Sequence, residues 1–361
     1  MNKFKVIGLM SGSSMDGVDI AYCEFSGSEN SWKYNIIKAE TVAYPETWRV
    51  RLSKLYKQDA ITYARTDIFY GHYLGALVKE FVKKYNLEVD FVASHGHTIF
   101  HDPKTKITRQ VGDGASLSAI CGLPVINDFR SMDVAKGGEG APLVAIGDKI
   151  LFPEYDYCLN LGGFANISGV YNNSRIAYDI CAANILLNRV ARDLGFDYDE
   201  DGKIAENGSI NYELLQALNS IPFFSKPFPK SLSREWINEE LWGQVRKSGF
   251  SAEDKMKTLV DHIGFQIGSS VNLLSGDQSE GKTLLITGGG AYNKTLISHI
   301  ESHTDAKIVI PENDVIEFKE AVIFALLGVL RVNNIVNVGS SYTGASSDSI
   351  AGGLHGKIPS V

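Results

Sequence analysis

The chain has 361 residues, of which 44% are hydrophobic and 21% charged, values that are ordinary for a globular protein. Because a single core stops growing at about 250–300 residues, this length favours two domains. The net charge of -7 and the lack of a lysine or arginine run argue against a nucleic-acid partner.

Targeting and redox signals are weak. We find no stretch of roughly 18 uninterrupted apolar residues, so we expect no membrane partner, and residues 1–10 lack the features of a signal peptide. The four cysteines are widely spaced and fit neither a zinc site nor a disulfide framework. The sequence therefore predicts reduced thiols and a cytoplasmic location.

Strand and helix patterns alternate along the chain, which predicts an α/β fold. The expected helix of the first half is Asp59–Tyr85, where apolar side chains recur at helical spacing. The expected strands of the first half are Lys5–Met10, Val18–Phe25, Lys33–Thr41, Phe91–Ser94 and Pro124–Asn127.

The opening pattern of strand, glycine turn and strand returns near residue 157. The expected strands there are Tyr157–Leu161, Ile167–Tyr171, Arg175–Asp179 and Thr283–Thr287, and the expected helices are Ala182–Leu194, one from about Asn293, and Glu317–Val332. This repeat of architecture predicts an N-terminal lobe (1–150) and a similar C-terminal lobe (151–335). Residues 336–361 are expected to pack back on the N-terminal lobe.

Three glycine-rich turns are candidates for phosphate binding. In the first, Gly12 and Gly17 flank small and hydroxyl residues whose backbone N–H groups can face an anion. The second is Gly162-Gly163, and the third, Gly288–Gly290, links a buried strand to a helix N-terminus. Taken singly, each could equally be a hairpin turn, a bulge or a plain strand-to-helix turn without a ligand.

Asp179 is expected to end a strand and precede a helix, where ligands bind in open α/β sheets. There it could act as a general base or simply cap the helix. Asp128 and Arg130 also follow a predicted strand, so the same argument applies to them.

The segment His95-Gly96-His97-Thr98 is predicted at the end of a buried strand. Its two histidines could recognise substrate hydroxyls, bind a metal or play a structural part, but no third ligand of the right type is nearby. Glu139, between glycines, is expected to be exposed, where it either binds substrate or is solvated.

Taken jointly and in order, these motifs resemble the anhydro-N-acetylmuramic acid kinase family. The segments that carry the resemblance are Gly8–Asp19, His95–Thr98, Gln110–Asp113, Asp128–Arg130, Gly137–Leu143, Asn160–Asn166, Gly288–Asn293, Glu320-Ala321 and Thr343–Ala345.

The resemblance implies a two-lobed actin/hexokinase-like (ribonuclease-H-like) fold with an interdomain cleft. It implies an ATP- and Mg²⁺-dependent kinase that opens the 1,6-anhydro ring of anhydro-N-acetylmuramic acid and phosphorylates O6 in peptidoglycan recycling. Direct protein ligation of the metal is not assigned, and a homodimer is a candidate assembly.

The resemblance also assigns residues to roles. Asp179 would be the catalytic base, with Glu320 as a supporting carboxylate. The expected ATP contacts are Gly12, Ser13, Ser14, Met15, Asp16, Gly17, Val18, Asp19, Gly162, Gly163, Gly288, Gly289 and Gly290. The expected substrate contacts are His95, Asp128, Arg130, Glu139 and Pro142.

Three positions depart from the family pattern. The family's Asp-Thr-Gly-Pro-Gly-Asn reads Asp179-Ile180-Cys181-Ala182-Ala183-Asn184, and His97 and Glu139 stand where glutamines are usual. Glu139 replaces a neutral donor and acceptor with an anion that only accepts. Two alternatives therefore stay open: a kinase for a different amino sugar or anhydrosugar, and an ATP-binding regulator without catalysis.

Overall fold

The computed structural model describes residues 2–12, 15–29, 31–276 and 278–357. The chain divides into two compact units: unit 1 is residues 1–152 with 318–361, and unit 2 is residues 153–317. The sequence placed residues 318–335 in the second lobe, whereas in the structure their contacts group them with unit 1.

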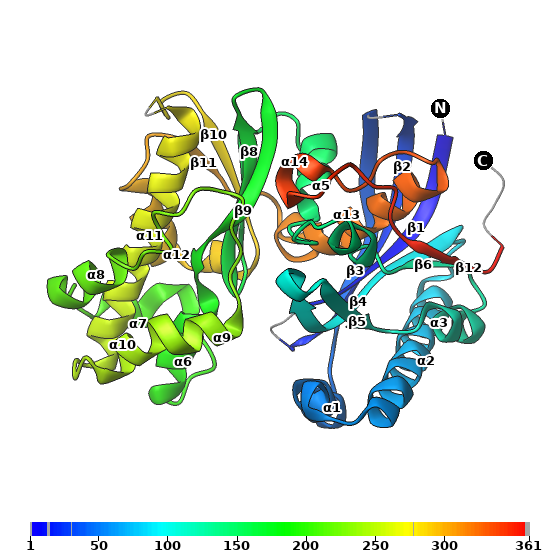
Figure 1. The fold of residues 1–361 in the computed structure, drawn as a ribbon, viewed down its shortest axis with the longest axis horizontal. Coiled ribbons are helices and arrows are strands. Elements are labelled where there is room, and N and C mark those ends of the chain that lie inside the picture. The colour runs from blue at the N-terminus through cyan, green and yellow to red at the C-terminus, as the bar shows by residue number, and fades with distance from the viewer. Residues whose placement is uncertain (1, 13–14, 30, 277, 358–361) are drawn as a thin grey trace. The chain divides into compact units, whose positions relative to one another are not determined.

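Unit 1 contains a mixed sheet in the order β12-β6-β4-β1-β2-β3, with β5 paired to β4 (Figure 1). Strands β1, β2 and β3 are antiparallel neighbours, whereas β4 and β6 continue the sheet parallel to β1. Strand β12 adds antiparallel to β6, so the C-terminal segment joins this sheet. The strands are β1 (Asn2–Ser11), β2 (Gly17–Ser28), β3 (Ser31–Ala43), β4 (Phe91–Asp102), β5 (Ile107–Val111), β6 (Val125–Asn127) and β12 (Gly353–His355).

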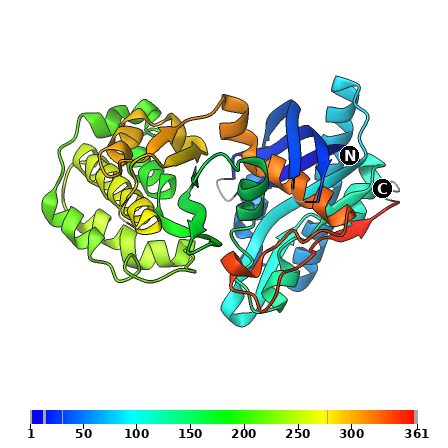
Figure 2. The same cartoon turned by 90° about the horizontal axis from the view of Figure 1, so that it is seen from above.

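Helices cover both faces of this sheet because residues on either side of its strands are buried. Ile7 and Leu9 of β1 share a core with Tyr70 and Leu74 of α2. On the other face, α13 runs across the strands, as Figure 2 shows in orange. The helices are α1 (Glu46–Lys54), α2 (Ala60–Tyr85), α3 (Gly114–Cys121), α4 (Ser131–Ala135), α5 (Val144–Leu151), α13 (Asn313–Val332) and α14 (Ser340–Thr343).

Unit 2 contains a second mixed sheet in the order β11-β10-β7-β8-β9. Its three antiparallel strands and two parallel strands repeat the order β6-β4-β1-β2-β3 of unit 1. This shared order confirms the predicted repeat and the actin/hexokinase-like fold class. The strands are β7 (Tyr157–Leu161), β8 (Phe164–Tyr171), β9 (Ser174–Ala182), β10 (Thr283–Thr287) and β11 (Lys307–Val309).

The long helix α11 forms the centre of the unit 2 core, where Leu259, Ile263 and Ile267 are fully buried. None of the described helices is both long and apolar enough to cross a membrane. The helices of this unit are α6 (Asn184–Asp193), α7 (Lys203–Glu206), α8 (Tyr212–Asn219), α9 (Arg234–Trp236), α10 (Gly243–Lys247), α11 (Ala252–Ser275) and α12 (Lys294–Glu301).

Several strands run further than the sequence predicted, and in β4 and β9 the extension changes the place of candidate residues. Strand β4 continues past Ser94 to Asp102, because β5 folds back on it. Strand β9 continues past Asp179 to Ala182, where it pairs with Phe164 of β8. His95, His97 and Asp179 therefore lie within strands rather than at strand ends.

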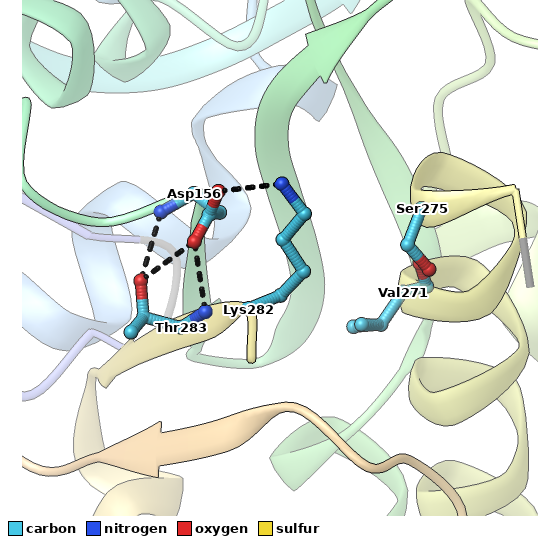
Figure 3. Close-up of polar contacts among 5 residues, drawn as sticks. All are labelled: Asp156, Val271, Ser275, Lys282 and Thr283. Carbon is cyan, nitrogen blue, oxygen red and sulfur yellow. Dashed lines mark hydrogen bonds and ion pairs between the residues drawn. The ribbon is translucent and has the colours of Figure 1, made fainter. Parts of the chain in front are cut away.

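Asp156 joins the beginnings of β7 and β10 (Figure 3). Its Oδ2 accepts hydrogen bonds from the backbone N of Thr283 at 2.9 Å and from Thr283 Oγ1 at 3.0 Å, and Lys282 Nζ lies 3.1 Å from Oδ1. Partial burial opposes the charge, but the hydrogen bonds from Thr283 and Lys282 outweigh it and lower the pKa of Asp156.

Substituting Asp156→Asn is expected to lower the free energy of unfolding by about 1–3 kcal/mol at neutral pH. Because the folded-state pKa is depressed, this contribution is present above the unfolded-state pKa and is lost as pH falls through the folded one. Urea unfolding at neutral pH and below about pH 3 measures the effect. The exposed Glu154→Gln is the control, and equal curves for both variants at neutral pH would contradict the assignment.

Candidate functional site

Buried hydroxyls fix the base of the first glycine loop. Ser11, the last residue of β1, has its Oγ 2.8 Å from His97 Nδ1 and 2.5 Å from the Tyr44 hydroxyl. The Tyr44 hydroxyl in turn bonds to that of Tyr70, which is fully buried. These hydrogen bonds therefore hold Ser11, the residue before the loop, in place.

The predicted phosphate loop is only partly described. Ser13 and Ser14 lie outside the described residues. Met15 has a left-handed φ of 64°, and a Cβ on Gly17 would lie 2.3 Å from the Val42 carbonyl oxygen, so the sheet itself requires that glycine. Asp16 is exposed.

The next two residues of this loop lie in β2. Val18 is buried in the core of unit 1. Asp19 accepts a hydrogen bond from Thr41 Oγ1 at 2.6 Å.

A second cluster joins β4 to the segment that follows β6. Arg130 donates from Nε to His95 Nε2 at 2.9 Å and from a terminal nitrogen to the Gly140 carbonyl oxygen. Because Nε2 accepts, the His95 proton sits on Nδ1, which lies 2.9 Å from the Gly96 carbonyl oxygen. Burial, and then the charge of Arg130, hold the pKa of His95 well below its usual range. His95 is therefore neutral at physiological pH.

Local backbone irregularity sets the direction of these side chains. The pairing of β1 with β4 shifts register between Leu9 and Ser11, and Gly96 there has a φ of 73°. Such bulges bend a strand and turn its side chains, and they are common beside active sites. Beside this bulge the two histidines have different partners: His95 bonds to Arg130, and His97 bonds to Ser11.

The remaining predicted substrate residues lie in the same unit. Asp128 is exposed and accepts from the backbone N of Ser131 at 3.3 Å. Glu139 was predicted to be exposed but is half-buried, and its backbone N donates to the Thr343 carbonyl oxygen at 2.7 Å. Pro142 is also partly buried and follows a cis peptide bond.

Glu320 lies on α13 among charged groups of unit 1. Burial raises the pKa of its carboxyl, nearby Lys319 and Arg130 lower it, and Asp19 raises it further. Lys319 itself forms an ion pair with Asp148 at 3.1 Å, and both side chains are only 2% exposed. Lys319 of α13 and Asp148 of α5 therefore form a strongly desolvated pair, and Glu320 beside Lys319 is half-buried.

In unit 2, the second glycine turn is tied to the start of α6. The backbone N of Asn184 donates to the Gly162 carbonyl oxygen at 3.2 Å, and that of Ile185 donates to the Gly163 carbonyl oxygen at 3.2 Å. A Cβ on Gly162 would meet its nearest neighbour at 3.6 Å and one on Gly163 at 3.9 Å, so packing requires neither glycine.

The three glycines at residues 288–290 differ in whether packing requires them. A Cβ on Gly288 would lie 2.5 Å from Asn160 Oδ1, and one on Gly290 would lie 2.8 Å from Leu161 Cβ. Packing on the end of β7 thus requires both residues, whereas a Cβ on Gly289 meets nothing. A short 3-10 turn at Gly289–Tyr292 follows these glycines, and the helix expected from about Asn293 is α12, which Asn293 caps.

Asp179 is not the cap of α6, because Ala183 occupies that position. The pairing of β8 with β9 shifts register between Ala165 and Asn166, which places a bulge at Ile180 beside Asp179. Asp179 Oδ2 accepts from the backbone N of Leu232 at 2.9 Å.

Sequence reasoning missed the segment 230–232, which lies along Asp179. The backbone N of Asp179 donates to the Lys230 carbonyl oxygen at 3.0 Å. Burial lowers the pKa of Lys230, whose Nζ donates to the Phe224 carbonyl oxygen at 3.1 Å. The run of prolines and lysines before Ser231 was the available signal.

No group of three or more His, Cys, Asp or Glu side chains is placed to hold a metal ion within the described part of the chain.

The sequence model of the anhydro-N-acetylmuramic acid kinase family matches residues 4–357. The chain is 34% identical over 373 residues to the anhydro-N-acetylmuramic acid kinase of Zymomonas mobilis, covering 97% of this chain and 99% of the relative. It is 32% identical to that of Haemophilus influenzae, with 97% of each chain covered. A solved activator of 2-hydroxyisocaproyl-CoA dehydratase from Clostridium difficile, with bound ADPNP, aligns with 89% of this chain and 93% of its own at 15% identity and a TM-score of 0.45.

Replacing Glu320 by glutamine is expected to stabilise the protein at pH values above the carboxyl pKa, by about 0.5–2 kcal/mol. A raised folded-state pKa means that the folded state loses stability as pH rises through the range between the unfolded and folded values. The variant lacks that loss, so its stability should exceed that of the wild type more at pH 8 than at acid pH. Denaturant unfolding across pH, with the exposed Glu80→Gln as control, measures this. Equal pH dependence in Glu320→Gln and wild type would contradict it.

Proposed function

Because the chain belongs to the anhydro-N-acetylmuramic acid kinase family, we propose that it opens the 1,6-anhydro ring of anhydro-N-acetylmuramic acid and phosphorylates O6. The observation that carries this proposal is the family match over residues 4–357. The enzyme is a phosphotransferase with an alcohol acceptor, and we place its reaction in peptidoglycan recycling in the cytoplasm.

The proposed reaction consumes one water and one ATP for each sugar. Asp179 accepts a proton from water while the water oxygen attacks the anomeric carbon. The bond from that carbon to O6 breaks, and O6 takes the γ-phosphoryl group, leaving ADP. The hydrogen bond from the Leu232 backbone N fixes one carboxylate oxygen of Asp179 and leaves the charge in place for this step.

One charge of unit 1 suits recognition of a polar, anionic sugar. Arg130 supplies a permanent cation, and His95 is neutral, so it adds no second charge. Glu320 acts as a supporting carboxylate. Asp128, Glu139 and Pro142 remain proposed sugar contacts.

Two glycine turns fit close approach by a nucleotide. Gly162, Gly163 and Gly289 have space where a Cβ would lie, so the backbone there is open to phosphate or a flat ring. The phosphates are also proposed to contact Gly12, Met15 and Asp16. Ser13 and Ser14, which lie outside the described residues, keep the same proposed role.

Mg²⁺ is expected to arrive with the nucleotide. In the proposed complex the ion is held mainly by phosphate oxygens and water. When bound, the ion neutralises charge on the transferring phosphoryl group.

One observation favours a different anhydrosugar or amino sugar as a second candidate substrate. The side chains of Ile180, Cys181, Ala182 and Ala183 are all buried, at 1% exposure or less. This apolar segment replaces the hydroxyl and flexible backbone expected beside Asp179, so the shape near the base can differ from that of relatives.

The direct test incubates the protein with ATP, Mg²⁺ and 1,6-anhydro-N-acetylmuramic acid and reads the product by mass spectrometry. We expect a gain of one water and one phosphoryl group. Asp179→Asn should bind ATP normally but turn over about 10²–10⁴-fold more slowly, because the base is lost. The exposed Asp193→Asn of the same unit is the matched control.

Unchanged turnover in Asp179→Asn would exclude it as the base. Phosphorylation of another amino sugar, but not of this one, would favour the second candidate. ATP binding without product from any sugar would reject a kinase and favour a regulator.

A pair of alanine substitutions separates ligand glycines from packing glycines. Gly163→Ala should weaken ATP binding about tenfold with little change in melting temperature, since its Cβ fills open space. Gly290→Ala should instead cost about 1–3 kcal/mol of stability by overpacking against Leu161. Calorimetric ATP titration and thermal unfolding measure both, and normal ATP affinity in Gly163→Ala would remove that turn from the nucleotide site.

A further inference from the structure

Asp133, on α4, is a buried carboxylate that no predicted role uses. Its side chain is 1% exposed. Its Oδ1 accepts from Thr343 Oγ1 at 2.7 Å, and its Oδ2 accepts from the backbone N of Gly140 at 2.8 Å. A carboxylate removed from water in this way is costly unless its partners are kept, so both hydrogen bonds are needed.

The loop at residues 136–140 wraps closely around this carboxylate. A Cβ on Gly138 would lie 2.3 Å from Asp133 Oδ2, so glycine is required there. Backbone bonds then attach the loop to the C-terminal segment. Glu139 N donates to the Thr343 carbonyl oxygen at 2.7 Å, and Ser346 N donates to the Lys136 carbonyl oxygen at 3.1 Å.

The same loop carries the contact that orients Arg130. The Gly140 backbone N is held by Asp133, and its carbonyl oxygen accepts from Arg130. Arg130 also donates to His95 Nε2. One continuous path of hydrogen bonds therefore runs from Thr343 through Asp133, Gly140 and Arg130 to His95.

A purely structural role for this path and a positioning role predict different effects of substitution. Loss of a structural hydrogen bond lowers stability without selecting between the substrates. Loss of a positioning bond moves the guanidinium, and small displacements of a substrate-binding group can weaken its contacts by large factors. Because the path ends at Arg130 and His95, loss of a positioning bond should weaken binding of the sugar and leave binding of ATP unchanged.

We propose that Asp133 and Thr343 are positioning residues that hold Arg130 and the loop at residues 137–142 for binding the sugar. The C-terminal segment thereby takes part in substrate binding through Thr343. This inference rests on the proposed function only in assigning the sugar to Arg130 and His95.

The test compares Thr343→Val with the conservative Thr343→Ser. We expect the valine variant to raise the KM for the sugar about tenfold, leave the KM for ATP unchanged, and lose less in kcat than in kcat/KM. Serine keeps the hydroxyl and should restore the wild-type KM. The matched control is Thr258→Val in unit 2, which removes another fully buried hydroxyl, one that donates to the Asp254 carbonyl oxygen and accepts from the Asn211 backbone N.

A second variant and a second measurement keep the proposal testable by itself. Asp133→Asn retains the side-chain volume. Its amide has one acceptor oxygen in place of two, so it cannot accept both hydrogen bonds. Hydrogen exchange of residues 136–142 in the full chain, without any sugar, should be faster in Asp133→Asn and Thr343→Val than in wild type.

The outcomes separate this inference from the proposed function. If the wild type does not phosphorylate the sugar but exchange in the loop still rises, the proposed function fails and the positioning of the loop stands. If the wild type is active and both variants keep its sugar KM, or if the KM values for sugar and ATP rise equally, the positioning role is wrong. Unchanged loop exchange in both variants would also overturn it.

Discussion

The close seating of α13 on β1 determines the arrangement of unit 1. A Cβ on Gly8 would lie 1.9 Å from the Ala321 carbonyl oxygen, so helix and strand backbones touch directly. A Cβ on Gly328 would lie 2.8 Å from the Ala93 side chain of β4, so the helix also packs tightly there. On this helix, Glu320 lies among the charges of Asp19 and Arg130.

This seating also brings charges into a desolvated environment, which is expensive unless each is compensated. Lys319 and Asp148 compensate one another directly. For Glu320, burial outweighs the nearby cations Lys319 and Arg130 and raises the pKa, and for His95 burial holds the pKa well below its usual range. Unit 1 therefore retains unfavourable electrostatics where a reaction centre would use them, as expected when function limits stability.

Local pattern predicted the strands well and the side-chain directions poorly. Tyr157–Leu161 and Thr283–Thr287 were predicted with their observed bounds, because apolar runs between turn residues mark buried strands. The bulge at Ile180 depends on how two strands pair, which periodicity does not encode. The bond between Asp133 and Thr343 spans 210 residues of sequence, so only the fold reveals it. The sequence thus proposes candidate site residues one by one, whereas the hydrogen-bond network that joins some of them is visible only in the fold.

The altered segment after Asp179, the proposed base, changes fewer of the contacts of this carboxylate than the sequence suggests. Ile180 to Ala183 are buried in the core of unit 2, whereas the bonds from the Leu232 backbone N and to the Lys230 carbonyl oxygen come from elsewhere in the chain. Loss of the hydroxyl and glycines therefore reshapes the apolar wall next to the carboxylate and leaves these two bonds intact. Since proton transfer depends on the carboxylate and its immediate bonds, whereas discrimination between sugars depends on shape, the divergence should alter the choice of sugar before it abolishes the chemistry.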